Sequence, residues 1–485
     1  MIEIQDFSFC YPGQEKPVVQ HVDLQIQQGE VVLLCGRSGC GKSTLLKAMN
    51  GMIPHVENGT FSGTVLLNQK NIAEIPMYLL SQEIGSVFQN PKSQFFNLDS
   101  DSELAFSMEN AGYPPEQIQR RIEEMTKLFQ IQHIRGRSIF EMSGGEKQIL
   151  AIASVCAAEP AVYIMDEPTA NLDISAIEKL KAILKLLKQQ GKTIVIAEHR
   201  LSYLSEIADM VYYVENGRIA KNYPADAFYR MSEPEREALG LRQLHAIPQN
   251  RNSHINHGEE VLTAQNISAA YGKKQILDGL FFKACAGDVI GITGKNGAGK
   301  TTLCRSVCGL MKPSGGRFFL HQKACSEKQL QQKSYLIMQD VNHQLFGESV
   351  EDECQISLEP EEYPKAEMIL EQMQLLPYRK AHPMSLSGGQ KQRLAIAAGM
   401  LQEKEIYLFD EPTSGLDYTS MLQVKEQIET LAGKGACVFI ITHDMELLDL
   451  LCNRCFFMRD AHLTEIFADR HFSEIVLEML SQTGQ

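Results

Sequence analysis

The chain has 485 residues, of which 44% are apolar and 22% are charged, and its 60 acidic residues outnumber 46 Lys and Arg to give a formal net charge of −14. This length is too great for one hydrophobic core and favours two domains of roughly 200 residues or somewhat more. The acidic balance argues against a broad nucleic-acid surface, for which basic stripes are typical, so we expect no nucleic-acid partner.

No segment approaches the roughly 18 consecutive apolar residues that a membrane helix needs, and the first five residues lack the character of a signal peptide. We therefore expect a cytoplasmic polypeptide that does not itself cross a bilayer. The twelve cysteines are expected to be free thiols, as in reducing compartments.

The first candidate site is a glycine-rich loop that follows the apolar run 31–35. The loop fits the pattern G-x-x-x-x-G-K-[ST] and opens a helix-forming segment, which is the context that this phosphate-binding pattern requires. Backbone N–H groups can then face phosphate oxygens, while Lys42 adds charge and Ser43 offers a hydroxyl to Mg²⁺. We predict nucleotide contacts at Gly36, Arg37, Ser38, Gly39, Cys40, Gly41, Lys42, Ser43 and Thr44.

Two carboxylates, Asp166 and Glu167, end the apolar run 161–165. An aspartate at a strand end beside a phosphate loop can hold Mg²⁺, and the next glutamate can polarise an attacking water. A solvated acidic turn would be the better reading of an isolated pair. With a phosphate loop upstream, we predict Asp166 as a magnesium and nucleotide contact and Glu167 as a catalytic residue.

A polar stretch at 233–258 separates the two halves and contains Pro234, Pro248 and an Asn-Arg-Asn-Ser run. We predict a first domain over 1–232, a linker over 233–258 and a second domain over 259–485. Without paired cysteines or acids at ligand spacing, the three linker histidines are interpreted as solvated rather than metal-binding. They are His245, His254 and His257.

The second half repeats the first. Matching residues are 258 positions apart at Lys42 and Lys300, and 244 apart at Asp166 and Asp410, which indicates deletions in surface loops of the second copy. The repeat predicts a second catalytic glutamate, Glu411, and magnesium contacts at Thr301 and Asp410. The predicted nucleotide contacts of this copy are Gly294, Lys295, Asn296, Gly297, Ala298, Gly299, Lys300, Thr301, Thr302 and Asp410.

Each copy also places Ser-Gly-Gly before an apolar helical stretch, within 142–148 and 386–393. Alone this is an ordinary turn, but the ordered set resembles the signature motif of ATP-binding cassette (ABC) proteins, where a helix terminus can bind an anion. The resemblance covers nearly the entire chain. It implies ATP contacts at Ser143, Gly144, Gly145, Ser387, Gly388 and Gly389.

The same resemblance implies further roles: adenine-stacking tyrosines, Q-loop glutamines that contact ATP and Mg²⁺, D-loops and catalytic switch histidines. Strand-edge packing is the alternative for either tyrosine. The matching residues are the tyrosines Tyr11 and Tyr271, the glutamines Gln89 and Gln339, the D-loops 170–173 and 414–417, and the histidines His199 and His443.

For the fold, the resemblance implies an α/β protein of two tandem P-loop cassettes. Each would have a mainly parallel core sheet, an antiparallel β subdomain and an inserted helical subdomain, near 100–155 and 348–398. Two ATP sites would form head to tail, each between the phosphate loop of one cassette and the signature of the other. The first signature departs from the commoner pattern at Met142, Glu146 and Ile149, which leaves equal turnover of the two sites open.

A finer resemblance lies in residues 50–55 and 87–96, which look like the ATPases of energy-coupling factor (ECF) transporters, importers of vitamins and transition-metal ions. It implies a transmembrane coupling subunit and substrate-binding membrane subunits as partners, and a peripheral position on the cytoplasmic side of the cell membrane. The alternatives are the fused ATPase of a sugar importer and a soluble ABC ATPase acting on ribosomes or DNA.

The resemblance to ABC transporters also implies that four apolar residues near the Q-loops form an exposed docking surface for the membrane subunit. An amphipathic turn tucked under the domain is the alternative for residues 94–96. The four residues are Phe95, Phe96, Leu345 and Phe346.

Overall fold

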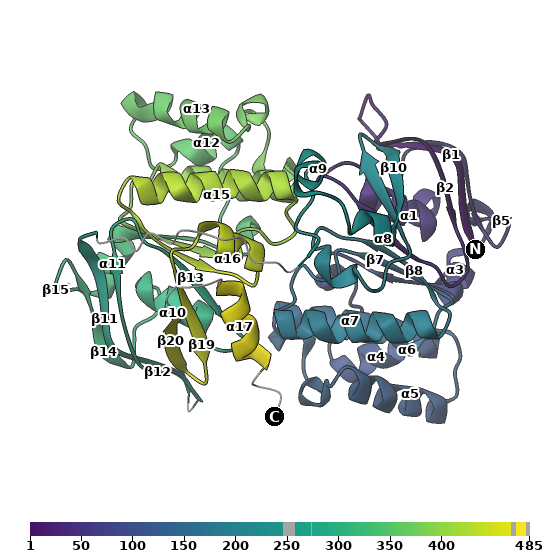
Figure 1. Ribbon diagram of the computed structural model, residues 1–485, viewed down its shortest axis with the longest axis horizontal. Helices are drawn as coiled ribbons and strands as arrows, with labels where there is room; N and C mark the ends of the chain where they lie inside the picture. The colour runs from purple at the N-terminus through teal and green to yellow at the C-terminus, as the bar shows by residue number, and fades with distance from the viewer. Residues whose placement is uncertain (246–257, 273, 467–471, 482–485) are drawn as a thin grey trace. The chain divides into compact units, whose positions relative to one another are not determined.

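The computed structural model describes residues 1–245, 258–272, 274–466 and 472–481. The chain divides into two compact units, Met1–Ala246 and Ile247–Gln485 (Figure 1). Each unit contains one six-stranded and one four-stranded sheet, with helices between the strands. Two tandem α/β units with this composition confirm the predicted fold class.

A six-stranded sheet forms the centre of the first unit. Its members are β3 (Val31–Cys35), β6 (Ile84–Val87), β7 (Val162–Asp166), β8 (Thr193–Ala197), β9 (Met210–Glu215) and β10 (Arg218–Pro224). In the order β10-β9-β3-β8-β7-β6, all neighbours run parallel except β10, which pairs antiparallel with β9 at the edge. All five residues of β3 are buried, as a parallel sheet covered on both faces requires.

The four-stranded sheet of this unit is antiparallel, in the order β2-β1-β4-β5. Its strands are β1 (Ile2–Cys10), β2 (Val19–Ile26), β4 (Thr60–Leu67) and β5 (Lys70–Asn71). Alternate residues of β3 then belong to two cores: Val32 and Leu34 pack with this sheet, and Val31 and Leu33 pack with the helical insertion. The alternation follows from the two-residue period of a strand.

The helices of the first unit include the predicted insertion, which consists of α4 (Ser100–Asn110), α5 (Pro115–Leu128) and α6 (Gly144–Ala157). The other helices are α1 (Lys42–Met49), α2 (Met52–His55), α3 (Met77–Glu83), α7 (Ile174–Gln189), α8 (Ala225–Phe228) and α9 (Glu233–Ala238).

The second unit has the same two sheets. Its six-stranded sheet, in the order β16-β17-β18-β13-β19-β20, contains β13 (Val289–Gly294), β16 (Ser334–Ile337), β17 (Ile406–Asp410), β18 (Cys437–Ile441), β19 (Arg454–Arg459) and β20 (His462–Ile466). Its antiparallel sheet, in the order β12-β11-β14-β15, contains β11 (Glu260–Tyr271), β12 (Lys274–Cys285), β14 (Gly315–Leu320) and β15 (Lys323–Ala324).

The helical insertion of the second unit is also present, as α12 (Val350–Gln355), α13 (Tyr363–Gln372) and α14 (Gly388–Met400). The remaining helices are α10 (Lys300–Val307), α11 (Glu327–Lys333), α15 (Tyr418–Gly433), α16 (Met445–Leu451) and α17 (Phe472–Ser481).

The predicted linker differs from the structure at its beginning. Residues 233–245 belong to the first unit, because α9 is followed by Leu241 and Leu244, which are 3% and 2% exposed within its core. The guanidinium of Arg236 is buried with them and pairs with Glu233 at 2.7 Å. The sequence did not predict this packing, because most residues of the segment are polar. Residues 246–257 of the linker, with His254 and His257, lie outside the described residues.

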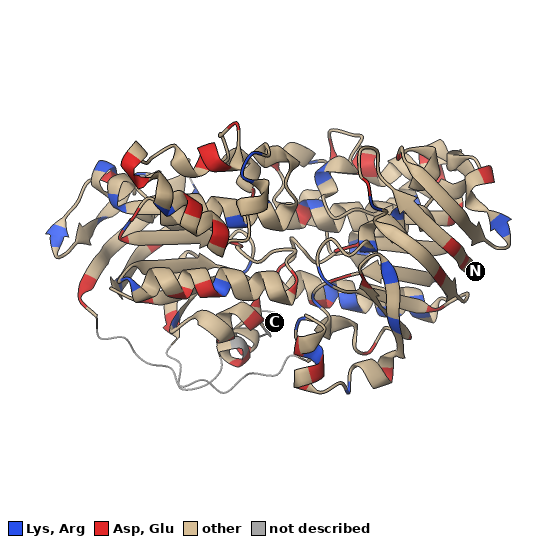
Figure 2. Ribbon diagram, turned by 90° about the horizontal axis from the view of Figure 1, so that it is seen from above, with Lys and Arg blue, Asp and Glu red and all other residues tan. Residues whose placement is uncertain are grey.

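Charged residues of both signs are interspersed along the elements of both units (Figure 2). All twelve cysteines lie within the described residues, and none of them forms a disulfide there. Within the part of the chain that the structure describes, no helix combines the length and apolar character that crossing a membrane requires.

Candidate functional site

Each glycine-rich loop curls around the ammonium group of its own lysine. Lys42 Nζ donates to the carbonyl oxygens of Gly36 at 2.9 Å and Arg37 at 3.1 Å, and Lys300 Nζ donates to those of Gly294 at 2.7 Å and Lys295 at 3.1 Å. The two lysines are 5% and 7% exposed. Both loops therefore have the same closed shape.

Glycine is required at the start of each loop. Gly36 and Gly294 have φ of 145° and 142°, values that side-chain-bearing residues rarely adopt. A Cβ atom on either would lie 2.2 Å from a backbone oxygen, of Val214 or of Met458. The adjacent strand thus fixes the path of the loop.

A carboxylate and a hydroxyl meet at the end of each loop. The Ser43 hydroxyl hydrogen-bonds to the Asp166 carboxyl group, and Thr301 does the same with Asp410. Burial raises the pKa of both aspartates, against the effect of the loop lysines. Asp166 Oδ1 is buried and has no hydrogen-bond partner among the described residues. An orphaned carboxylate oxygen beside a hydroxyl fits the hard oxygen ligands that Mg²⁺ prefers.

Glu167 is the centre of a buried polar cluster in the first unit. Gln89 Nε2 donates to Glu167 Oε2 at 2.9 Å, His199 Nε2 lies 3.5 Å from Glu167 Oε1, and Lys42 Nζ lies 3.4 Å from the same histidine nitrogen. Four predicted site residues from four separate segments are thus brought together.

Burial dominates the protonation of this cluster. It raises the pKa of Glu167 to about 8, with further upward contributions from Glu198 and Asp166, while Lys42 and Gln89 act in the opposite direction. Burial also holds the pKa of His199 well below its usual value. Burial thus favours the uncharged form of both side chains.

The second unit assembles a related cluster. His443 Nε2 lies 3.8 Å from Glu411 Oε1 and 3.3 Å from Asn296 Oδ1, while Thr442 Oγ1 and the His443 backbone N–H donate to Glu411 Oε2 at 3.3 Å. Glu167 and Glu411 both have left-handed backbones, with φ of 45° and 51°. This uncommon conformation recurs at the corresponding position of both copies.

The Ser-Gly-Gly segments begin α6 and α14 with the same capping box. Ser143 Oγ accepts from the Glu146 N–H at 3.3 Å while Glu146 accepts from the Ser143 N–H at 2.7 Å, and Ser387 and Gln390 make the equivalent pair of bonds. Glycine fills the first two helical positions of each. The start of each helix is therefore well defined by its capping residues.

The departures in the first signature are accommodated locally. Met142 is buried as Leu386 is, and Glu146 replaces the capping glutamine while also accepting from Arg137 at 3.1 Å. Ile149 is 9% exposed within the core. The replacements thus preserve the capped helix.

The two candidate adenine-stacking tyrosines differ. Tyr11 packs edge-on against Phe9 with ring centroids 4.8 Å apart, and its hydroxyl lies 3.4 Å from Thr44 Oγ1. Tyr271, at the end of β11, is 52% exposed. The first tyrosine thus packs against a neighbouring ring, whereas the second projects from its strand.

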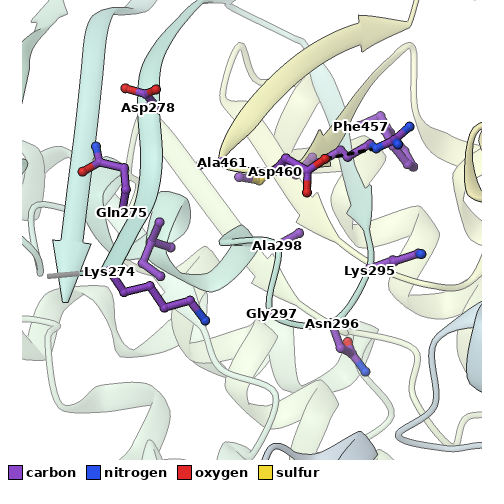
Figure 3. Close-up of a pocket in the computed structure, with 13 residues that line it drawn as sticks. Lys274, Gln275, Asp278, Lys295, Asn296, Gly297, Ala298, Phe457, Asp460 and Ala461 are labelled. Atoms are coloured by element: carbon purple, nitrogen blue, oxygen red, sulfur yellow. Dashed lines mark hydrogen bonds and ion pairs between the residues drawn. The ribbon is translucent and has the colours of Figure 1, made fainter. Parts of the chain in front are cut away.

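A cavity of about 530 Å³ adjoins the second loop. Asn296, Gly297 and Ala298 border it, together with residues of β12 and of the β19–β20 turn, among them Lys274 and Asp460 (Figure 3). Charged side chains of both signs thus surround a space next to the predicted nucleotide contacts.

The predicted docking residues differ in exposure. Phe96 and Phe346 are 75% and 79% exposed, but Leu345 is 5% exposed and Phe95 packs against the core. The expectation of four exposed residues is therefore wrong for Leu345, which the fold needs as a core residue.

Sequence reasoning missed several buried carboxylates near these sites, among them Glu103, Glu353, Glu198 and Asp444. Glu103 Oε2 accepts from the N–H groups of Phe96 and Asn97 at 3.2 and 3.0 Å, and Glu353 accepts from those of Phe346 and Gly347. Glu103 and Glu353 are 250 residues apart, as are the Q-loop glutamines, and this shared spacing was the available signal.

Comparison with known proteins identifies the family. Residues 19–170 and 277–414 match the family described as ABC transporter. A Treponema denticola protein with the provisional name ABC transporter ATP-binding protein is 41% identical over 486 residues, covering 99% of each chain. A Bacillus subtilis protein, provisionally named HMP/thiamine import ATP-binding protein YkoD, is 30% identical over 96% of this chain and 90% of its own.

Among solved structures, one titled RNase-L Inhibitor has a TM-score of 0.68 at 20% identity, covering 98% of this chain and 93% of that one. At this identity the likeness concerns the fold alone. The full-length relatives and the two family matches decide the question of membership: the chain belongs to the ABC transporter ATP-binding family, with two ATP-binding cassettes that support ATP hydrolysis.

Proposed function

We propose that this chain is the energy-coupling subunit of an ECF-type import complex, in which ATP hydrolysis by two cassettes drives uptake of a vitamin or a transition-metal ion. The exposed Phe96 and Phe346 carry this proposal, because a large apolar side chain at the same place in both cassettes suits a protein partner. The import-related name of the Bacillus subtilis relative also supports it.

The hydrolytic chemistry would fall to the residues around the two phosphate loops. Ser43, Asp166 and Gln89 would hold Mg²⁺ in the first cassette, and Thr301, Asp410 and Gln339 in the second. When bound, the metal neutralises charge on the phosphates. Glu167 and Glu411 orient and deprotonate the attacking water, and His199 and His443 hold the transferring phosphoryl group.

Each site would be completed by the other cassette. Ser143, Gly144 and Gly145 would contact the nucleotide held by Lys300, while Ser387, Gly388 and Gly389 would contact the one held by Lys42. The capped helix starts supply backbone N–H groups suited to the γ-phosphate. Closure of the cassettes on ATP would be the mechanical output.

The partner would be a transmembrane coupling subunit that also binds substrate-binding membrane subunits. Beside Phe96, a groove of about 680 Å³ lies between the core and the helical insertion, with Tyr78, Phe106 and Tyr113 among its apolar lining. Its size and lining suit a short amphipathic helix at the cytoplasmic end of a membrane protein. The chain would then sit peripherally on the cytoplasmic side of the membrane.

Isolation of the tagged chain from its own cells tests this function. We expect a multi-spanning membrane protein to co-purify and substrate uptake in membrane vesicles to require ATP. The variant Phe96→Asp/Phe346→Asp should lose both while the isolated chain still binds ATP, because docking would bury two unpaired charges. The control Leu186→Asp/Met368→Asp alters exposed apolar residues elsewhere and should retain both. Recovery of the chain with ribosomes and without a membrane protein would contradict the proposal.

A further inference from the structure

The segments around the two switch histidines differ in where they place a buried carboxylate. In the first cassette Glu198 precedes the histidine and Arg200 follows it, whereas in the second Thr442 precedes the histidine and Asp444 follows it. Glu198 and Asp444 are 2% and 5% exposed. Each cassette therefore has a buried carboxylate directly beside its histidine, but on opposite sides of it.

Glu198 joins the switch segment to the turn that follows the catalytic glutamate. Its Oε2 accepts from Thr169 Oγ1 at 2.7 Å and from the Tyr203 hydroxyl at 3.3 Å. Its Oε1 accepts from the backbone N–H groups of His199 at 2.8 Å and Arg200 at 3.2 Å. Four donors satisfy this buried carboxylate, as its desolvation requires.

Asp444 makes the corresponding link in the second cassette. Its Oδ2 accepts from Thr413 Oγ1 at 2.6 Å, and Thr413 stands two residues after Glu411, as Thr169 stands two residues after Glu167. Its Oδ1 accepts from the Leu447 N–H at 3.2 Å and caps α16.

The chain that follows the histidine has a different structure in the first cassette. Arg200 cannot cap a helix, and there a short 3₁₀ turn, Ser202–Leu204, takes the place of α16. The buried carboxylate thus stands before the histidine in one cassette and after it in the other. The threonine hydroxyl that donates to it keeps the same position in both cassettes.

We propose that Glu198 is the positioning residue of the first ATP site, and that it performs from the position before His199 the task that Asp444 performs from the position after His443. The task is to hold the switch histidine in a fixed relation to the catalytic glutamate through the buried threonine. This inference rests on the proposed roles of Glu167 and His199. It goes beyond them because Glu198 would act without touching the nucleotide.

A chain carrying Glu411→Gln confines hydrolysis to the first site and allows the test. In that background Glu198→Gln should lower kcat about tenfold, because one carbonyl oxygen replaces two carboxylate oxygens that serve four donors. KM for ATP should stay within about twofold, since no nucleotide contact is removed. Glu206→Gln, at an exposed glutamate in the same segment, should leave both unchanged.

Exchange of the two residues gives a second, independent readout. Glu198→Thr alone should lower kcat as Glu198→Gln does, whereas Glu198→Thr/Arg200→Asp should recover to within about threefold of the background, because it restores the carboxylate from the side that the second cassette uses. In a Glu167→Gln chain, Asp444→Asn should produce a similar loss at the second site.

Three results would overturn the inference: an unchanged kcat in Glu198→Gln, a proportional rise in KM, or a double exchange no faster than Glu198→Thr alone. A different result would identify failure of the proposed function. If the Glu411→Gln chain hydrolyses ATP no faster than the Glu167→Gln/Glu411→Gln chain, the first site has no catalytic glutamate and both proposals fall.

Discussion

Gln89 donates its side-chain amide to Glu167 at 2.9 Å, so the Q-loop and the proposed catalytic carboxylate are in direct contact. The Q-loop leads within seven residues to Phe96, the proposed docking side chain. A displacement of that loop by a partner would therefore reach the catalytic carboxylate through one hydrogen bond. This short connection gives a physical route from a membrane subunit to ATP hydrolysis.

Both sites should depend on their glutamates. Glu167→Gln and Glu411→Gln should each lower steady-state ATPase while leaving ATP binding, and the double variant should retain less than about 1% of the activity, since loss of a general base costs about 10² to 10⁴ in rate. Phosphate release and nucleotide titration measure the two effects. A single variant that hydrolyses at the parental rate would show that its site is not catalytic.

Cys40 offers chemical access to the first site. It is 9% exposed and its Sγ lies 3.9 Å from Lys42 Nζ. We expect a small reagent such as methyl methanethiosulfonate to block nucleotide binding at this site, and bound ATP to protect the thiol. Cys40→Ala should keep ATPase activity, because Ala298 occupies the same place in the second loop, and should remove the sensitivity. Equal inhibition of Cys40→Ala would assign the effect to another cysteine.

Glu103 should fix the loop that carries Phe96. Glu103→Gln weakens three bonds to a buried carboxylate, from the backbones of Phe96 and Asn97 and from the Asn97 amide, and should lower the free energy of unfolding by about 1–3 kcal/mol. Binding to the membrane partner should weaken and ATP binding should not. Glu109→Gln, exposed on the same helix, is the control. If binding to the membrane partner is unchanged in Glu103→Gln, Glu103 has no role in docking.

The segment after α9 should stabilise the first cassette. Leu244→Ala should lower the unfolding free energy of that cassette in the full chain by about 3 kcal/mol, since it leaves a cavity in a packed core. Urea unfolding measures the loss, and Glu235→Ala, at an exposed position of α9, should be nearly neutral. An equal effect of the two changes would show that this segment does not stabilise the first cassette and is better described as part of the linker.

The ion pair of Asp101 with Arg135 should make stability depend on pH. A hydrogen bond from Arg135, at 2.6 Å, is the largest cause that lowers the pKa of Asp101, against the effect of burial. A carboxyl group whose pKa is lower in the folded state stabilises that state at pH values above its unfolded pKa of about 3.9. This stabilisation is lost as the pH falls further and the carboxyl becomes protonated. The stability difference between the parent and Asp101→Asn should therefore shrink below about pH 4 in unfolding titrations. A constant difference would exclude the linkage.

Local patterns predicted the phosphate loops, the strand-end carboxylates and the helix starts at the Ser-Gly-Gly segments, because each depends on residues adjacent in the chain. Packing between distant segments could not be read in this way. Leu345 and Phe346 are neighbours of similar polarity, yet one is buried and the other exposed. Glu198 stands 29 residues from Thr169, and only the fold brings the two together.

The loop carbonyls that hold Lys42 and Lys300 have a consequence for affinity. A lysine side chain carries about 2 kcal/mol of rotamer entropy, and here most of it is already lost in the folded chain. When a triphosphate binds, the lysine ammonium group exchanges two neutral carbonyl acceptors for anionic phosphate oxygens. Binding then costs little further side-chain entropy at the lysine. Nucleotide affinity should then respond strongly to ionic strength and weakly to changes that loosen the surrounding surface loops.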